Sequence, residues 1–135
     1  VLAYVVADDV GTMINPAGVK GQIHGGVAQG LGQALMEQVV YDPESGQLLS
    51  GSFMDYAMPR AADMPSIQVE NNAVPSGLNP LGAKGAGEAG TVGAIPAVMN
   101  AVNDALASVG AAAIEMPATS EKVWRSLQAA HTRGD

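Results

Sequence analysis

The chain has 135 residues, of which 47% are hydrophobic and only 14% charged, and its net charge is −7. A negative chain without a basic stretch is not expected to bind nucleic acid, and no apolar run approaches the roughly 20 residues of a membrane span. Cysteine is absent, which excludes disulfides, thiolate metal sites and cysteine nucleophiles. Free-standing domains carry about a quarter charged residues, so we expect other protein to cover much of this surface.

The first part of the chain predicts a strand followed by a long helix. Residues 1–7 are apolar and predict a buried strand that ends at Asp8, Asp9 and Gly11, with the two acids as turn and capping residues. Because the run starts at the first residue, we expect the chain to be part of something larger. Apolar side chains then recur every four positions, which predicts a helix: Ile23, Val27, Leu31, Leu35 and Val39.

The predicted helix also contains several glycines, among them Gly25 and Gly26. Each glycine costs roughly 1 kcal/mol relative to alanine inside a helix, so we expect another backbone or a ligand to pack closely against it. Gln22 and Gln29 share a face with these glycines at helical spacing. Gln22 is therefore a candidate polar contact to whatever lies opposite, and an ordinary solvated side chain is the alternative.

The middle of the chain predicts a hairpin, a strand and a long loop. A turn at residues 42–46 separates two short apolar stretches, and residues 67–71 alternate as a half-buried strand does. Residues 52–58 suit either a short helix or an irregular segment. Residues 75–90 contain two prolines and five glycines, which predicts a long loop. Loops of this length in compact domains usually have a function.

Two helices are predicted in the last third. The first covers residues 95–109, with Pro96 near its first turn and Gly110 just after its end. The second is a terminal amphipathic helix in which Trp124 is expected to be a packing anchor. The predicted fold class is α+β, with short mixed or antiparallel strands covered by two long helices and a C-terminal helix.

One stretch, residues 82–90, has the sequence GAKGAGEAG and is called the glycine loop below. Glycine permits close approach of the backbone to a bulky partner, and Glu88 is the only acid in the loop, so it is a candidate general base. A flexible loop with one exposed glutamate is the alternative. Lys84 is followed by Gly85 rather than serine or threonine, which excludes a P-loop. His24 and His131 are far apart and predict no zinc site.

Four segments resemble the molybdenum hydroxylases, the family of xanthine dehydrogenase, aldehyde oxidase and aerobic carbon monoxide dehydrogenase. Residues 21–35 resemble the family's glycine-rich cofactor helix, and residues 79–88 resemble its active-site loop. Residues 51–59 and 117–124 also match in order and spacing. The resemblance covers essentially the whole chain and implies that residues 1–135 are the C-terminal portion of a molybdenum-cofactor-binding domain, as a fragment, a processed piece or a separate subunit.

The resemblance assigns roles to individual residues. Glu88 matches the catalytic glutamate beside molybdenum, and Gln22 matches a glutamine that contacts the molybdopterin. The remaining cofactor-binding residues match the loop whose backbone lines the cofactor: Lys84, Gly85, Ala86 and Gly87. No residue is expected to ligate the metal directly. Ala89 and Gly90 stand where the xanthine dehydrogenase branch has two prolines, which favours the carbon monoxide, aldehyde and N-heterocycle branch and puts purine oxidation in doubt.

The implied function is one part of an active site that oxidises an aldehyde or an N-heteroaromatic carbon with water-derived oxygen. The cofactor would be molybdenum–molybdopterin, with the cytosine dinucleotide form as an option, and iron–sulfur clusters and FAD would lie on partner domains or subunits. Activity would require the rest of the large subunit, and we expect a cytoplasmic or periplasmic location. Two alternatives remain open: a non-catalytic assembly domain of a multi-subunit complex, and an unrelated anion-binding module.

Overall fold

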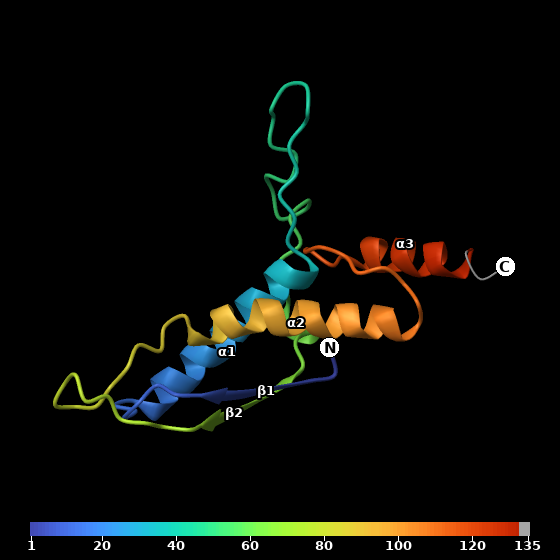
Figure 1. Cartoon of the computed structure of the whole chain (residues 1–135). Helices are drawn as coiled ribbons and strands as arrows, with labels where there is room; N and C mark the ends of the chain where they lie inside the picture. The colour runs from blue at the N-terminus through green and yellow to red at the C-terminus, as the bar shows by residue number, and fades with distance from the viewer. Residues whose placement is uncertain (133–135) are drawn as a thin grey trace. The chain divides into compact units, whose positions relative to one another are not determined.

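The computed structural model describes residues 1–132, which form two compact units. Unit 1 comprises Val1–Gly30 and Arg60–Ala94, and unit 2 comprises Leu31–Pro59 and the chain from Ile95 onward. Two long helices, α1 (Pro16–Leu35) and α2 (Ala89–Ser108), each contribute residues to both units (Figure 1). The helices and short strands together confirm the predicted α+β class.

Unit 1 contains a two-stranded parallel sheet. Strand β1 (Ala3–Asp8) pairs with β2 (Ser66–Asn71), with Ala3 opposite Ser66 and Asp8 opposite Asn71. Alternate side chains of each strand are partly buried, as the alternation of residues 67–71 predicts for β2. The prediction of a buried strand at residues 1–7 is wrong, since Leu2 is 100% and Val5 is 63% exposed. Two isolated antiparallel bridges, Gly11–Ala83 in unit 1 and Tyr41–Leu48 in unit 2, make the strand pairing mixed. The carboxyl ends of both strands therefore lie side by side in unit 1.

Helix α1 buries the apolar stripe predicted for it, but over a shorter length. Ile23, Val27 and Leu31 are at most 2% exposed, whereas Val39 lies beyond the helix and is 56% exposed. A strict four-residue repeat drifts around a helix of 3.6 residues per turn. The buried line consequently passes from Leu31 to Ala34, three positions on, and the prediction that Val39 continues the stripe is wrong.

Helix α2 begins earlier than predicted. The carbonyl oxygen of Glu88 accepts hydrogen bonds from the amides of Thr91 and Val92, so the helix starts directly after Glu88. Pro96 is consequently inside the helix rather than in its first turn, where it removes one backbone donor. The small residues 89–94 have the composition of a loop, and this composition misplaced the predicted start.

The end of α2 matches the prediction. Gly110 has a left-handed backbone with φ of 74°, a conformation that glycine adopts without a Cβ penalty. The amide of Gly110 donates to the carbonyl of Ala107 at 3.0 Å, and the amide of Ala111 donates to that of Leu106 at 2.9 Å. This paired arrangement is a Schellman cap, which satisfies the last carbonyls of the helix.

Within unit 1, α1 and α2 approach each other through two glycines. A Cβ added to Gly90 would lie 2.5 Å from the carbonyl oxygen of Ile23, and one added to Gly26 would lie 2.8 Å from the amide nitrogen of Thr91. The close backbone that the glycine-rich helix predicted is, at Gly26, the other helix of the same chain. Gly25 has no such neighbour in the described residues, since nothing lies within 4 Å of the position that a Cβ would take there.

This contact predicts opposite effects for two glycines of α2. Gly90→Ala is expected to lower the free energy of unfolding by about 1–3 kcal/mol, because the new methyl group meets backbone atoms that cannot move aside freely. Gly93→Ala is the matched control, since its Cβ position is open, and it is expected to be neutral or to add up to ~1 kcal/mol through helix propensity. Denaturant unfolding of the assembled protein measures both, and equal effects would contradict the contact.

Unit 2 is built around a hairpin and the C-terminal helix. The hairpin pairs Val40 with Leu49 around the predicted turn, and residues 52–56 form a single turn rather than a helix. Helix α3 (Ser120–His131) is capped by Thr119, whose hydroxyl accepts from the amide of Lys122. Trp124 is 59% exposed, so its predicted role as a packing anchor within this chain is wrong.

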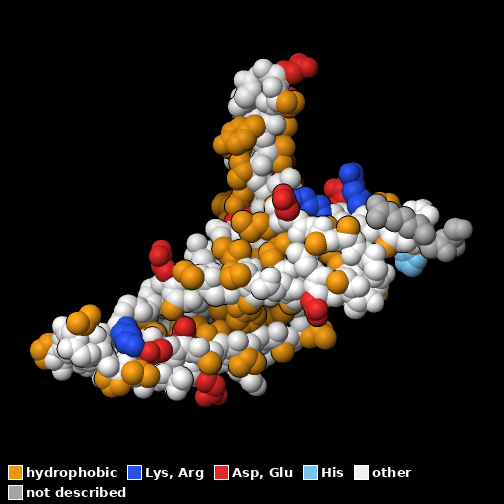
Figure 2. All heavy atoms as spheres, viewed as in Figure 1, with side chains coloured by type: hydrophobic (Ala, Val, Ile, Leu, Met, Phe, Trp, Pro, Cys, Tyr) orange, Lys and Arg blue, Asp and Glu red, His pale blue; other side chains and the backbone are white. Residues whose placement is uncertain are grey.

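Large apolar side chains remain exposed in both units (Figure 2). The most exposed are Leu2, Leu78, Met54 and Phe53, each at least 84% exposed. Exposed apolar side chains in this number agree with the low charged fraction of the sequence and with the expectation that other protein covers part of this surface. No helix in residues 1–132 combines the length and apolar character needed to cross a bilayer.

Candidate functional site

The loop between β2 and α2 is fastened to the end of β1 by backbone hydrogen bonds. The carbonyl oxygen of Gly82 accepts from the amides of Thr12 and Ser76, both at 3.0 Å, and the amide of Lys84 donates to the carbonyl of Val10 at 3.1 Å. The bonds from Thr12 and Lys84 form the antiparallel bridge at Gly11 and Ala83, and the bond from Ser76 lies within the loop itself. The first third of the glycine loop is therefore held against the residues that follow β1.

Glycine is required at two positions of this attachment. Gly11 and Gly82 have φ of 61° and 66°, the left-handed region that other residues rarely adopt. A Cβ on Gly11 would collide with the carbonyl oxygen of Gly82, and one on Gly82 would lie 2.9 Å from the Cβ of Pro75. Gly85 and Gly87 have neither feature: no left-handed φ and nothing within 4 Å of a Cβ position. Within the described residues 1–132, no contact explains why these two positions are glycine.

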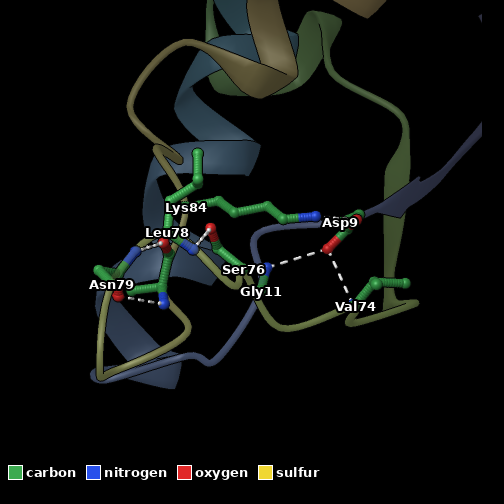
Figure 3. A network of polar contacts seen from close by, with 8 residues as sticks. Asp9, Gly11, Val74, Ser76, Leu78, Asn79 and Lys84 are labelled. Atoms are coloured by element: carbon green, nitrogen blue, oxygen red, sulfur yellow. Dashed lines mark hydrogen bonds and ion pairs between the residues drawn. The ribbon is translucent and has the colours of Figure 1, made fainter.

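A polar network centred on Asp9 completes the attachment (Figure 3). One carboxylate oxygen, Oδ1, accepts from the amides of Gly11 and Val74, both at 3.0 Å. The other, Oδ2, accepts from the Nζ of Lys84 at 2.6 Å. The predicted turn-capping role of Asp9 is thus observed, and its ion pair with Lys84, 75 positions away, is an addition that the sequence analysis missed.

The same network shifts the titration of Asp9. The hydrogen bond from Lys84, helped by those from Val74 and Gly11, lowers the pKa of Asp9 from 3.8 to about 2. A lowered carboxyl pKa stabilises the folded state above the ordinary pKa, and this stabilisation is lost as the pH falls from about 4 toward 2. The carboxylate is therefore ionised, and paired with Lys84, at every pH near neutrality.

Glu88 lies at the other end of the glycine loop, at the N-terminal end of α2. Its carbonyl accepts the first two hydrogen bonds of that helix, which places the residue at the N-cap position. Its side chain is exposed, so the poorly solvated environment expected for a general base is not supplied by this chain alone. The positive end of the helix dipole favours a carboxylate at this point.

The contact between α1 and α2 brings Gln22 toward the same place. Gln22 directly precedes Ile23, whose carbonyl faces Gly90, and Glu88 lies two positions before Gly90. The side chain of Gln22 is exposed, and Gln29 approaches the Thr91 hydroxyl at 3.4 Å. Of the predicted site residues, Glu88, Gln22 and the loop residues 84–87 are thus all in unit 1, near the start of α2.

His24 makes a local contact within α1. Its Nδ1 donates to the carbonyl oxygen of Lys20 at 2.7 Å, one turn earlier in α1. A carbonyl is only an acceptor, so this nitrogen carries the proton. The interpretation of His24 as an ordinary helix residue agrees with this geometry.

The glycine loop is open at Gly85 and Gly87. Gly85 and Gly87 are exposed and have free space where a side chain would stand, so an incoming group can contact the backbone amides directly. A separate cavity of about 140 Å³ lies among Asp8, Val10, Val19 and Val69 in unit 1. Ligand pockets usually enclose about 300–1,000 Å³, so the cavity is too small for a pterin and the open loop is the better candidate.

Comparison with known proteins decides the family. A family model described as a molybdopterin cofactor-binding domain matches residues 1–65. The chain is 46% identical over 121 residues to the nicotine 6-hydroxylase large subunit of Paenarthrobacter nicotinovorans, covering 90% of this chain and 15% of that subunit. It is 42% identical over 125 residues to the carbon monoxide dehydrogenase large chain of Hydrogenophaga pseudoflava, covering 93% and 15%. The chain belongs to the molybdenum hydroxylase family.

A solved structure supports the same assignment at the level of the fold. The quinoline 2-oxidoreductase of Pseudomonas putida 86 matches this molybdenum hydroxylase chain with a TM-score of 0.86 and 46% identity, covering 92% of the chain and 16% of the solved one. The chain therefore spans only about 15% of the length of the relatives it matches. The predicted family and the molybdopterin-dependent oxidoreductase class of its relatives are confirmed.

Proposed function

We propose that this chain forms one wall of the molybdenum-cofactor site in a hydroxylase that oxidises an aldehyde or an N-heteroaromatic carbon with water-derived oxygen. The observation that carries the proposal is the placement of Glu88 at the start of α2, beside two glycines whose Cβ positions are open. Relatives named for nicotine and quinoline support the N-heteroaromatic class. Residues 1–135 would be the C-terminal portion of the cofactor-binding domain and would act only with the rest of the large subunit.

Each site residue has a definite task in this proposal. The molybdenum cofactor, when bound, supplies the two-electron redox chemistry. The Glu88 carboxylate accepts a proton during the attack on the substrate carbon, a task for which it must be ionised. The Gln22 amide donates to the pterin, and the backbone of residues 84–87 lines it. The ammonium of Lys84 is turned toward Asp9, so Lys84 contributes its backbone to this wall.

The remaining parts of the enzyme follow from the proposed reaction. Electrons removed from the substrate must leave the site, and iron–sulfur clusters and FAD on partner domains or subunits are the proposed carriers. The cofactor would be molybdenum–molybdopterin, with the cytosine dinucleotide as one form. Relatives named as a large chain and a large subunit agree with a multi-subunit enzyme. A cytoplasmic or periplasmic location is part of the proposal.

A non-catalytic assembly domain is the second candidate function, and the exposed apolar side chains of both units favour it. Metal and pterin analysis of the purified complex separates the two. The proposal expects molybdenum and pterin close to one per large subunit. A complex that contains the chain, is fully assembled and holds neither would support the assembly role and contradict the enzyme.

Two glutamines of α1 give a residue-level test. Gln22→Ala is expected to weaken cofactor retention or slow turnover by the equivalent of about 1.5–3 kcal/mol, one hydrogen bond to a charged group. Gln29→Ala is the matched control on the same helix, and its smaller effect follows from its contact with Thr91 rather than with the proposed pterin. Pterin content and kcat measure both. A harmless Gln22→Ala with a damaging Gln29→Ala would show that the face of α1 is assigned wrongly.

A further inference from the structure

We propose that Asp9 is a positioning residue of this site, whose ion pair with Lys84 sets the place from which Glu88 reaches the substrate. The inference rests on the proposed role of Glu88 as the proton acceptor. Asp9 itself lies at the end of β1 and touches neither substrate nor cofactor in this scheme. Its effect is carried through Lys84 and the three residues that follow it in the chain.

Asp9 joins three separate segments of unit 1. Its carboxylate accepts from Gly11 after β1, from Val74 after β2 and from Lys84 in the glycine loop. All three donors belong to unit 1. The Asp9 side chain thus ties the start of the glycine loop to the carboxyl ends of both strands, in addition to the backbone bonds of Gly82 and Lys84 (Figure 3).

The end of the glycine loop at the start of α2 is held by separate contacts. Gly90 packs against the backbone of Ile23, and the hydroxyl of Thr91 donates to the carbonyl of Gly26 at 3.1 Å. These contacts hold the first turn of α2 on α1. Glu88 immediately precedes this turn. It therefore lies in the chain between the contact with α1 and the Asp9–Lys84 ion pair.

The connection between the Asp9–Lys84 pair and the start of α2 is short. Only residues 85–87 separate Lys84 from Glu88, and each residue spans at most about 3.6 Å. Two of the three are glycines without a left-handed φ and with open surroundings, so the connection has much conformational freedom of its own. Its path therefore depends on how firmly its two ends are held. The backbone bond from Lys84 to Val10 remains when the ion pair is lost, but the Lys84 end is then held at fewer points, so the Glu88 carboxylate can shift.

The Asp9–Lys84 pair is expected to affect the position of Glu88 more than the stability of the fold. The side chains of Lys84 and Asp9 are 35% and 36% exposed, and exposed ion pairs contribute little to the free energy of folding. Displacement of a reacting group by about 1 Å can nevertheless cost about 100-fold in rate. Loss of the pair is therefore expected to appear in catalysis rather than in folding.

The test uses the assembled, molybdenum-loaded enzyme with kcat expressed per bound molybdenum. Asp9→Asn keeps an oxygen for Gly11 and Val74 but removes the charge that holds Lys84, and Lys84→Gln removes the other partner. Each is expected to lower kcat by about 10- to 100-fold, with KM and the unfolding temperature near those of the parent. Asp9→Glu, which keeps the charge, should recover part of the loss.

The control is another ion pair, in unit 2. Glu121 and Arg125 on α3 are also 2.6 Å apart and exposed, so Glu121→Gln removes an equally short pair that is not part of the glycine loop, and it should leave kcat unchanged. Asp9→Asn added to Glu88→Gln should cause no further loss, because both act through one carboxylate. Unchanged kcat per molybdenum in both Asp9→Asn and Lys84→Gln, with Glu88→Gln inactive, would overturn this inference alone. An active Glu88→Gln enzyme would instead overturn the proposed function.

Discussion

Glu88→Gln is expected to lower kcat by about 10²–10⁴-fold, the usual contribution of a positioned proton acceptor, while the molybdenum cofactor stays bound. Glutamine keeps the size of the side chain and the N-cap position at the start of α2, but it cannot take up the proton. Steady-state kinetics together with molybdenum analysis measures the effect. The side chain is exposed in this chain, so the loss should not come from unfolding.

Glu70→Gln is the control for this substitution. Glu70 is an exposed acid near the end of β2 in the same unit but outside the glycine loop. Its replacement changes the net charge by the same amount and should leave kcat at the parent value. Near-parental activity of Glu88→Gln would remove the glutamate from the mechanism.

Gly85→Val and Gly87→Val are expected to reduce the pterin content strongly while the protein still folds. Neither glycine has a left-handed φ, and within residues 1–132 nothing lies within 4 Å of either Cβ position. A valine is therefore accepted by the chain itself, and any obstruction it causes is with a group that approaches the loop from outside. Pterin content measured beside circular dichroism separates cofactor loss from misfolding.

Gly77→Val is the matched control for the two loop glycines. Gly77 lies between β2 and α2, outside the glycine loop, and is likewise exposed with an open Cβ position. The proposal gives it no contact with the cofactor, so its variant should load fully. Full loading of all three variants would show that the loop does not form a cofactor wall.

Local patterns predicted the elements of this fold that depend on neighbouring residues. The alternation of residues 67–71 and the apolar spacing of Ile23, Val27 and Leu31 identified β2 and α1, because both patterns follow from the geometry of a single element. The end of α2 just before Gly110 was predicted for the same reason, and the left-handed φ of Gly110 agrees with it. The start of α2 was not, since Gly90 and its small neighbours serve a contact with α1 that only the folded chain reveals.

The candidate site shows the same division. Glu88 stands out in the sequence as a lone acid among glycines, and the family resemblance supplied its proposed role. Asp9 does not stand out, because its partners Val74 and Lys84 are 65 and 75 positions away and no local pattern records such a contact. An acid directly after an apolar strand, together with a lone lysine in a distant loop, was the available signal. The prediction for Trp124 was wrong because a local pattern was followed too far. The amphipathic pattern of its helix predicted burial, but the side chain is exposed in this chain.

The position of molybdenum in crystals of the assembled large subunit tests the central claim most directly. Anomalous scattering at the molybdenum edge locates the metal without assumptions about the surrounding density. The account predicts that the groups bound to molybdenum lie within hydrogen-bond reach of the Glu88 carboxylate, about 2.6–3.2 Å or one water away, with residues 85–87 along the cofactor. Molybdenum bound at a site that neither Glu88 nor the glycine loop approaches would contradict it.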